Sequence, residues 1–341
     1  MSVLTICNRF VVANALTLLY TAQALLGILV NVLMNPFKNQ WAKKLNLVPP
    51  SNLTDPKYGD HKYIKVNNIK LHYVESGDVS KPLMLFLHGF PEFWYSWRHQ
   101  IVHFNKDYRV VAVDMRGYGD SEKPDGVSSY KIEYLVDDIK ELIRALGHEK
   151  CILVSHDWGG VIACKLRETY PEVLHALIVL SSASKDVWFR QIWSTTEQRK
   201  KSGYVFMFRT PMIPELLLQM NNLQSLDSFM LIKGKDTITK EDMECYKYWF
   251  GKQTGLTSPL NYYRANFSYS WEEKLYEENI PFLLAIGENE KFISHSCHDL
   301  MKARYTTIET ATVEKSGHFM QQEEPEKVNK LVRDFLQKYN L

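Results

Sequence analysis

The chain has 341 residues, of which 45% are hydrophobic and 23% are charged. This composition is that of a globular protein and excludes a disordered, collagen-like or low-complexity chain. The 41 basic and 39 acidic residues leave a net charge of only +2, so no nucleic-acid partner is expected. Because the five cysteines form no CxxC pair, they predict buried free thiols and neither a disulfide framework nor a zinc site: Cys7, Cys151, Cys164, Cys245 and Cys297.

An uncharged, largely aliphatic stretch runs from Phe10 to Phe37. As a helix it is longer than the roughly 30 Å of hydrocarbon in a bilayer. It is too long for the apolar region of a signal peptide, and no convincing small-x-small cleavage motif accompanies it. Residues 1–37 are therefore predicted to be an uncleaved N-terminal transmembrane helix. An apolar helix packed on the surface of the domain is the alternative.

The side of the membrane that the rest of the chain occupies is not fixed by the sequence. Three lysines between residues 38 and 44 follow the stretch and Arg9 precedes it, which slightly favours a cytoplasmic C-terminal region. The sequons at Asn52 and Asn266 would be used only in a lumenal one. We expect a single-pass protein of the endoplasmic reticulum membrane, with its orientation left open.

After a linker over residues 38–60, short apolar runs alternate with helical patterns. A hairpin is predicted over residues 63–74, with its turn at Asn67-Asn68. Further strands are predicted over 83–87, 109–113, 151–154, 176–180, 282–286 and 305–312, and helices over 96–104, 130–146, 158–170 and 326–339. Strands that alternate with helices indicate a mostly parallel sheet with helices on both faces, an α/β fold.

This alternation stops after Ser184 and resumes near residue 276. Residues 185–275 have a helical, aromatic-rich and irregular pattern. We therefore predict a core domain made of residues 61–184 and 276–341, with a helical lid inserted over residues 185–275. Such a lid would cover the carboxyl ends of the strands, where sheets of this kind bind ligands.

Residues 154–160 (VSHDWGG) place an acidic side chain between a short apolar strand and a helix. This is the setting of the nucleophile elbow G-x-S-x-G, with Asp157 in the position of the serine; an aspartate that only caps the helix is the alternative. On this fold the chain order is nucleophile, acid, histidine. Glu290 after the strand 282–286 and His318 before the last helix follow in that order, with Glu288 as a second candidate for the acid.

The loop HGFP at residues 88–91 follows the strand 83–87. A loop at this place supplies one backbone N–H to an oxyanion hole, here from Phe90, and the residue after the nucleophile, Trp158, supplies the other. A carboxylate nucleophile favours attack on a saturated carbon, which gives a stable ester. Water activated by His318 would then hydrolyse that ester while Glu290 orients the imidazole.

The leaving group on that carbon is either a halide or the oxygen of a strained epoxide. An epoxide oxygen leaves as an alkoxide and needs a proton donor, for which a neutral tyrosine is suitable. A halide prefers Trp or Asn N–H donors. The inserted segment offers candidates of both kinds, so composition alone does not choose: Tyr204, Tyr246, Tyr248, Tyr262 and Tyr263, and Trp188, Trp193 and Trp249.

These motifs closely resemble those of the α/β-hydrolase epoxide hydrolases of animals, especially the short membrane-anchored epoxide hydrolase 4 type. The resemblance covers about residues 60–340. It rests on HGFPE at 88–92 with WYSWR at 94–98, on DMRGYGDS at 114–121, and on SHDWGG at 155–160. It implies that Asp157 is the nucleophile and that the base is His318. The family acid is commonly Asp, and Glu290 stands in its place here.

The resemblance also assigns two tyrosines of the inserted segment as donors to the epoxide oxygen. Tyr204 matches the first, in the segment YVFMFRTP at 204–211, and Tyr263 matches the second, in PLNYYR at 259–264, with Tyr262 as its rival. The family often has a cis peptide bond between Phe90 and Pro91, which we expect here.

The activity implied is the hydrolysis of lipophilic epoxides, such as fatty-acid epoxides, to vicinal diols, with no metal or organic cofactor. A haloalkane dehalogenase with the same nucleophile is one alternative, and a non-catalytic binding protein of this fold is the other. The tyrosines matched to the family argue against the dehalogenase. Retention of the whole catalytic set argues against the binding protein. The oligomeric state is not predicted.

Overall fold

The structure, a computed structural model, describes residues 2–41, 48–231, 237–252 and 254–341. Part of the predicted linker, residues 42–47, therefore lies outside the described residues. The strands form one eight-stranded sheet in the order β1-β2-β4-β3-β5-β6-β7-β8. Their bounds are β1 Asp60–Val66, β2 Ile69–Ser76, β3 Leu83–Leu87, β4 Arg109–Val113, β5 Cys151–His156, β6 Leu174–Leu180, β7 Phe282–Gly287 and β8 Ile308–Val313.

Only the edge formed by β1 and β2 is antiparallel, and the pairs from β4 to β8 are parallel. The mostly parallel sheet predicted from the alternation of strands and helices is thus confirmed. Every residue of β3, β5 and β7 is buried, because helices cover both faces of a parallel sheet. This double burial explains why these strands are almost continuous apolar runs.

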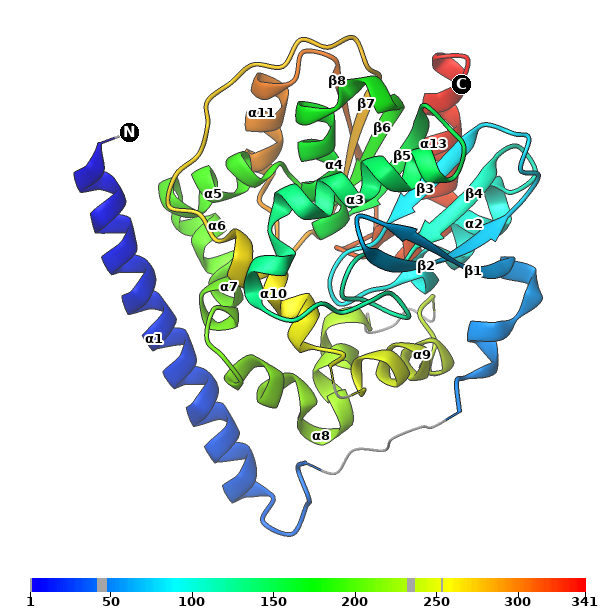
Figure 1. Cartoon of the computed structure of the whole chain (residues 1–341). Coiled ribbons are helices and arrows are strands. Elements are labelled where there is room, and N and C mark those ends of the chain that lie inside the picture. Colours follow the sequence, from blue (N-terminus) through cyan, green and yellow to red (C-terminus); the bar gives the residue numbers. More distant parts are fainter. Residues whose placement is uncertain (1, 42–47, 232–236, 253) are drawn as a thin grey trace.

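Two layers of helices cover the sheet (Figure 1). On one face α3 (Ile132–Ala145) packs against α4 (Trp158–Thr169), and on the other α2 (Arg98–Phe104) packs against α13 (Pro325–Lys338). Two helices were not predicted, α11 (His295–Arg304) between β7 and β8 and the short α12 (Met320–Glu323).

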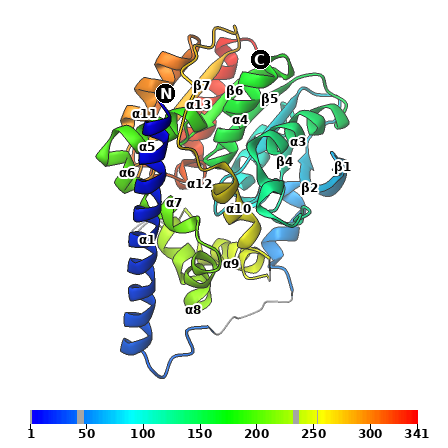
Figure 2. The same cartoon turned by 60° about the vertical axis from the view of Figure 1, so that its left-hand side comes forward.

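A run of helices separates β6 from β7, and we call residues 185–275 the lid segment. Figure 2 shows these helices gathered beyond one end of the sheet. Within the segment α7 contacts α10, and α8 contacts α9. The helices are α5 Lys185–Ser194, α6 Thr196–Lys201, α7 Gly203–Phe208, α8 Ile213–Met230, α9 Lys240–Phe250 and α10 Thr257–Asn266.

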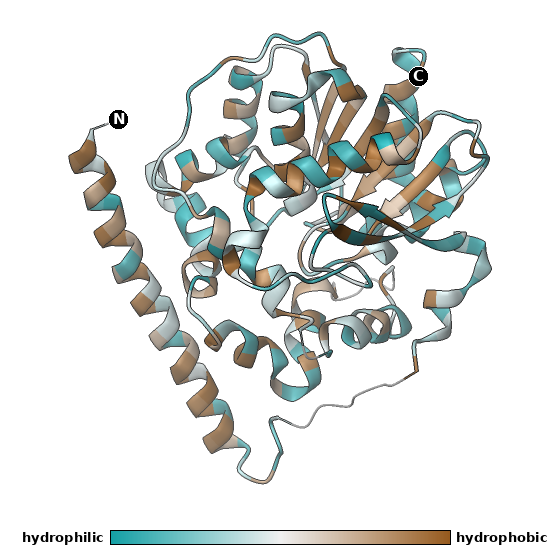
Figure 3. Cartoon of the chain, in the orientation of Figure 1, coloured by the Kyte–Doolittle hydropathy of each residue, from teal (hydrophilic) through white to brown (hydrophobic). Residues whose placement is uncertain are grey.

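The N-terminal helix α1 (Val3–Met34) starts earlier than the uncharged stretch. Among the described residues it is the one helix long and apolar enough to cross a membrane, and apolar residues occur along its whole length (Figure 3). It lies alongside the lid segment in both cartoon views (Figures 1 and 2). The ring of Tyr20 stacks on Phe206 with 6.2 Å between centroids. The helix therefore packs on the domain surface, as in the alternative that the sequence left open.

Two expectations drawn from single residues need correction. Cys7 is exposed on α1, whereas the other four cysteines are buried free thiols. The side chain of Asn266 is buried: its Oδ1 accepts from the backbone N–H of Ile132 at 2.7 Å, and its Nδ2 donates to the carbonyl of Tyr130 at 2.9 Å. A glycan would require this amide to leave the core, so the sequon at Asn266 is not usable in the folded chain.

Candidate active site

Asp157 occupies a strained turn at the carboxyl end of β5. Its φ of +47° and ψ of −117° lie outside the regions that L-residues usually adopt. The backbone is held from two sides, since Ser182 Oγ donates to the Asp157 carbonyl at 2.6 Å and the Asp157 N–H donates to the Leu180 carbonyl at 3.3 Å. A strained residue between a strand and a helix is the geometry of the nucleophile elbow.

The turn requires glycines around it because neighbouring atoms lie too close to leave room for a larger side chain. A methyl group at Gly159 would overlap the carbonyl oxygen of Leu87, and one at Gly89 would overlap the side chain of Asp157. One at Gly160 would lie 2.5 Å from Cβ of Ser182. The glycines therefore let the turn and the loop after β3 come together around the carboxylate.

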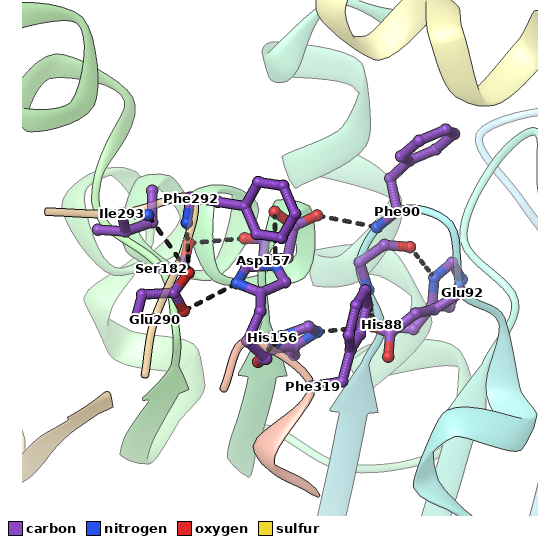
Figure 4. A network of polar contacts seen from close by, with 12 residues as sticks. His88, Phe90, Glu92, His156, Asp157, Ser182, Glu290, Phe292, Ile293 and Phe319 are labelled. Carbon is purple, nitrogen blue, oxygen red and sulfur yellow. Dashed lines mark hydrogen bonds and ion pairs between the residues drawn. The ribbon is translucent and has the colours of Figure 1, made fainter. Parts of the chain in front are cut away.

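His318 lies between two carboxylates. Its Nδ1 is 2.9 Å from Glu290 Oε2, and its Nε2 is 3.6 Å from Asp157 Oδ2. The other oxygen of Glu290 accepts the backbone N–H of Phe292 at 2.7 Å. Figure 4 shows Asp157 between Glu290 and Phe90. The structure thus brings together the three side chains that the chain order selected.

The second candidate for the acid lies elsewhere. Glu288 is exposed, and its Oε2 accepts the backbone N–H of Lys315 at 2.8 Å. Of the two glutamates, Glu290 is the one that contacts the imidazole of His318.

Charges within this trio set the pKa of each member. Burial lowers the pKa of His318, but the charges and hydrogen bonds of Glu290 and Asp157 outweigh burial and raise it to about 10. Burial raises the pKa of Glu290, but the charge and hydrogen bond of His318 and the Phe292 N–H bring it down to about 2. Burial raises the pKa of Asp157 as well, but the hydrogen bond and charge of His318 outweigh burial and hold this pKa below its usual value. The resting site is therefore an imidazolium between two carboxylates.

A backbone donor contacts the carboxylate oxygen of Asp157 that does not face His318. The N–H of Phe90 donates to Asp157 Oδ1 at 2.8 Å. Trp158 is the first residue of α4. Its N–H is therefore one of the first four in the helix, which have no hydrogen-bond acceptor within the helix. The Phe90–Pro91 peptide bond is cis, as the resemblance implied.

A cavity opens above Asp157. Tyr204 and Tyr263 both line it, with 5.9 Å between their ring centroids. Tyr262 points elsewhere, because its hydroxyl donates to the backbone carbonyl of Arg116 at 2.6 Å. Tyr263, and not its neighbour, therefore faces the carboxylate. The complete lining is Phe90, Pro91, Asp157, Tyr204, Phe208, Phe229, Tyr263, Phe292, His318 and Phe319.

Both cavity tyrosines are protonated at neutral pH. Burial raises the pKa of Tyr204 and of Tyr263 well above 10, and the negative charge of Asp157 raises each further. Their phenols therefore remain protonated and are available to a developing negative charge on a bound molecule.

A second buried acid–histidine pair, not predicted from the sequence, lies beneath this site. Glu92 accepts from Nδ1 of His156 at 2.6 Å and from the backbone N–H of Gly89 at 2.9 Å. Nε2 of His156 is 2.8 Å from the backbone carbonyl of His318. The pair thus links the loop that carries Phe90 to the backbone of His318. Glu92 lies in the motif HGFPE and His156 lies in the motif SHDWGG. These two motifs were the available sequence signal for the pair.

The elbow, the acid and histidine after later strands, and the inserted helices define a hydrolase of the α/β hydrolase fold. Residues 82–325 match the profile of the alpha/beta hydrolase fold family.

Epoxide hydrolase 4 of Mus musculus is 38% identical over 298 residues, covering 84% of this chain and 82% of that protein. Epoxide hydrolase 3 of Xenopus tropicalis is 37% identical over 296 residues, covering 84% and 80%. The chain belongs to the epoxide hydrolases of the α/β hydrolase fold, as the sequence motifs predicted.

Solved structures of epoxide hydrolases are also similar to this chain. An epoxide hydrolase mutant from Bacillus megaterium, in complex with its diol product, superposes with a TM-score of 0.74 at 32% identity, covering 81% of this chain and 100% of that one. An epoxide hydrolase from Vigna radiata superposes with a TM-score of 0.71, also at 32% identity, covering 82% and 98%.

Proposed function

We propose that this protein hydrolyses lipophilic epoxides to vicinal diols through an ester on Asp157. The observation that carries the proposal is the grouping of an ionised carboxylate, a histidine paired with Glu290, and two protonated tyrosines around one cavity. An epoxide needs these three functions, which are a nucleophile, a base for water and an acid for the oxygen.

In the first step Asp157 Oδ2 attacks an epoxide carbon, because Oδ1 is already held by the N–H of Phe90. A carbon–oxygen bond forms to the carboxylate as the ring carbon–oxygen bond breaks. Tyr204 or Tyr263 donates its proton to the ring oxygen as negative charge develops there. The product of this step is a hydroxyalkyl ester of Asp157.

Ester formation prepares the base for the second step. The charge of Asp157 contributes to the raised pKa of His318, and that charge disappears when the carboxylate becomes an ester. The pKa of the imidazole then falls, so the imidazolium returns its proton to the tyrosinate left by the first step, and neutral His318 accepts a proton from water through Nε2. Hydroxide adds to Cγ of Asp157, and the N–H groups of Phe90 and Trp158 stabilise the oxyanion on Oδ1. As the ester carbon–oxygen bond breaks, His318 protonates the departing alkoxide to give the diol and then takes the proton of the Asp157 carboxyl group, which restores the resting site.

The lining of the cavity supports a lipophilic substrate, with fatty-acid epoxides as the class to test first. Aside from the reacting groups, the lining consists of Pro91 and the phenylalanines, so binding is by apolar contact. We further infer that the lid segment, residues 185–275, excludes water from this cavity and that α1 attaches the enzyme to a membrane, with the endoplasmic reticulum as the compartment to examine.

The proposal is tested by offering the full chain a fatty-acid epoxide and an alkyl halide of matched length. Diol from the epoxide without halide release is expected. Asp157→Ala should abolish turnover, and His318→Gln should accumulate the ester, visible by mass spectrometry as enzyme plus one substrate mass. Halide release alone, or no covalent species in His318→Gln, would overturn the mechanism.

A further inference from the structure

Helix α1 has a face of small and polar residues that rests on the lid segment. Ala13 is fully buried, Thr17 and Tyr20 are half-buried, and Ala24 packs against the core cluster. These residues recur at intervals of three and four, so they share one face of the helix. The spacing shows that α1 is built to lie lengthwise against protein along this side.

The contacts on this face are specific. Arg209, which follows α7, donates from Nη1 to Thr17 Oγ1 at 3.0 Å. Near the start of α1, Arg9 donates to the carbonyl of Tyr269 at 2.9 Å. The ring of Tyr20 lies where a side chain at residue 203 would project, 2.7 Å from an added Cβ, so Gly203 makes room for it. α1 is thereby attached beside Tyr204, a residue of the proposed mechanism.

The opposite face of α1 is apolar and exposed. Leu4, Val11, Leu18 and Leu25 are exposed, with Leu18 at 73%. They lie seven residues apart, almost two full turns, and so form a single stripe. A continuous apolar stripe of this length exposed to water indicates an interaction surface.

A helix that keeps its contacts with the lid segment cannot also cross a bilayer. Arg209 meets α1 close to the middle of its length, at Thr17. If α1 spanned the membrane, this arginine and the lid surface around it would lie in hydrocarbon, where a charged side chain is strongly unfavourable. A span detached from the lid would instead expose Thr17 and Arg9 to lipid and leave Phe206 without the ring of Tyr20.

We infer that α1 lies parallel to the membrane, with its apolar stripe in the outer part of one lipid leaflet and its other face on the lid segment. This inference revises the single-pass topology predicted from the sequence. It rests on the proposed membrane attachment and not on the proposed reaction. Helices with one apolar face bind membranes in this way, at the boundary between headgroups and acyl chains.

The neighbouring element α8 carries further exposed apolar side chains, one of which lines the cavity. α8 contacts α1, and Leu216 near its start is exposed, as is Met212 just before it. Beyond the non-helical residues 220–223 that interrupt α8, Phe229 is 39% exposed and also lines the cavity above Asp157. A lipophilic epoxide dissolved in the leaflet would therefore meet the cavity at the membrane surface.

The sidedness of the two ends of α1 tests the inference directly. The full chain with an N-terminal epitope tag is made in the presence of sealed microsomes, and protease is then added from outside. If α1 lies in one leaflet, the tag and the catalytic domain are on the same side, so both are digested or both are protected. Protection of one with digestion of the other shows a span and overturns the inference.

Charge substitutions on the apolar stripe provide the second test. Leu18→Glu with Leu25→Glu is expected to reduce binding of the full chain to phosphatidylcholine vesicles at least tenfold in a flotation assay. Val79→Glu, at an exposed valine on the loop between β2 and β3, is the matched control and should bind as the unmodified chain does. Turnover of a water-soluble epoxide should be unchanged in all of these variants.

These outcomes separate failure of the inference from failure of the proposed function. Unchanged vesicle binding by the double variant would show that the stripe does not face lipid. Absence of binding by the unmodified chain would refute membrane attachment altogether. If the unmodified chain does not turn over the water-soluble epoxide, the proposed reaction is refuted. The result on vesicle binding is not affected by that outcome.

Discussion

Tyr204 and Tyr263 present two phenols to the same cavity, so under the proposed mechanism each would protonate the epoxide oxygen when the other is absent. We expect each single Tyr→Phe variant to lower kcat, and the double variant to lose most of the 10²- to 10⁴-fold that general-acid catalysis typically contributes. Tyr262→Phe is the control, because that hydroxyl is bonded to the Arg116 carbonyl and its loss should affect stability by about 1 kcal/mol. Ester formation at or near the normal rate in the double variant, measured in a single turnover, would exclude the assigned donors.

The two carboxylates beside His318 lead to a prediction about pH. Ester formation needs ionised Asp157, whose pKa is lowered, so this step should persist into mild acid. Ester hydrolysis needs neutral His318, which becomes scarcer as the pH falls. The ester should therefore accumulate at low pH, giving a larger fraction of modified enzyme at pH 5.5 than at pH 8 in rapid-quench mass spectrometry. The opposite trend would show that His318 does not limit the second step.

Residue types and chain order were sufficient to select Asp157 and His318 and to favour Glu290 as the acid, since each of these residues follows a predicted strand. They left Glu288 open as a second candidate for the acid and Tyr262 as the rival of Tyr263. Adjacent or alternate residues differ only in the direction of the side chain, which depends on backbone angles and packing. The Glu92–His156 pair was missed because its members are 64 residues apart and meet only when β3 and β5 pair.

At the scale of elements, the buried parallel strands were the most predictable feature, because their apolar runs have few alternatives. β3 and β4 have the predicted bounds. β8 begins at Ile308 and not at the predicted Tyr305, which instead forms an isolated bridge with Tyr276. α11 was missed since its residues are mostly polar and give only a weak helical pattern.

The position of α1 could not be predicted for a different reason. A long apolar helix is compatible with crossing a bilayer, lying in one, or packing on protein. Thr17, Tyr20 and Arg209 distinguish between these three placements of the helix. Their contacts join distant parts of the chain, so the sequence pattern of the helix alone does not reveal them.

The lid segment contains an ion pair that ties three of its helices together. The guanidinium of Arg264 on α10 makes two hydrogen bonds to Glu215 on α8, at 2.8 and 2.9 Å, and donates to the Phe208 carbonyl at the end of α7 at 3.1 Å. Both side chains are nearly buried. Arg264→Ala leaves the carboxylate without its partner and should lower the free energy of unfolding by about 3 kcal/mol.

Denaturant unfolding measures this loss, with Arg190→Ala as the control. Arg190 pairs with Glu273 at 3.2 Å where both side chains are exposed, and such pairs contribute at most about 1 kcal/mol. Equal effects of the two substitutions would show that the Arg264 pair does not hold the lid helices. A lower kcat in Arg264→Ala is also expected, because Tyr263 is the preceding residue on α10.

At the scale of the whole molecule, the sheet core carries the proposed nucleophile, acid and base, and the helices of the lid segment carry the proposed proton donors. The strands fix Asp157, Glu290 and His318 at one edge of the sheet, where backbone amides also converge. The lid segment adds Tyr204 and Tyr263 from α7 and α10, and α1 supports α7 from outside. Chemistry on the core and acid catalysis from the lid should therefore respond separately to substitutions.

Buried neutral histidines should make the stability of the fold depend on pH between about 7 and 5. Burial lowers the pKa of His88, whose Nε2 accepts the N–H of Met115 at 3.1 Å and so must be unprotonated. Burial also lowers the pKa of His298 to about 4. The unfolded chain binds protons at these sites below about pH 6.5 while the folded chain does not, so the free energy of unfolding falls as the pH falls.

Each such histidine contributes up to about 1.4 kcal/mol per pH unit in this window, and the carboxylates with lowered pKa values act only at lower pH. Denaturant unfolding at pH 7, 6 and 5 should therefore give a steadily decreasing free energy. His298→Gln should reduce the slope, whereas His295→Gln, at an exposed position on the same helix, serves as the matched substitution. A slope that His298→Gln leaves intact would mean that this imidazole takes up its proton in the folded chain as readily as in the unfolded one.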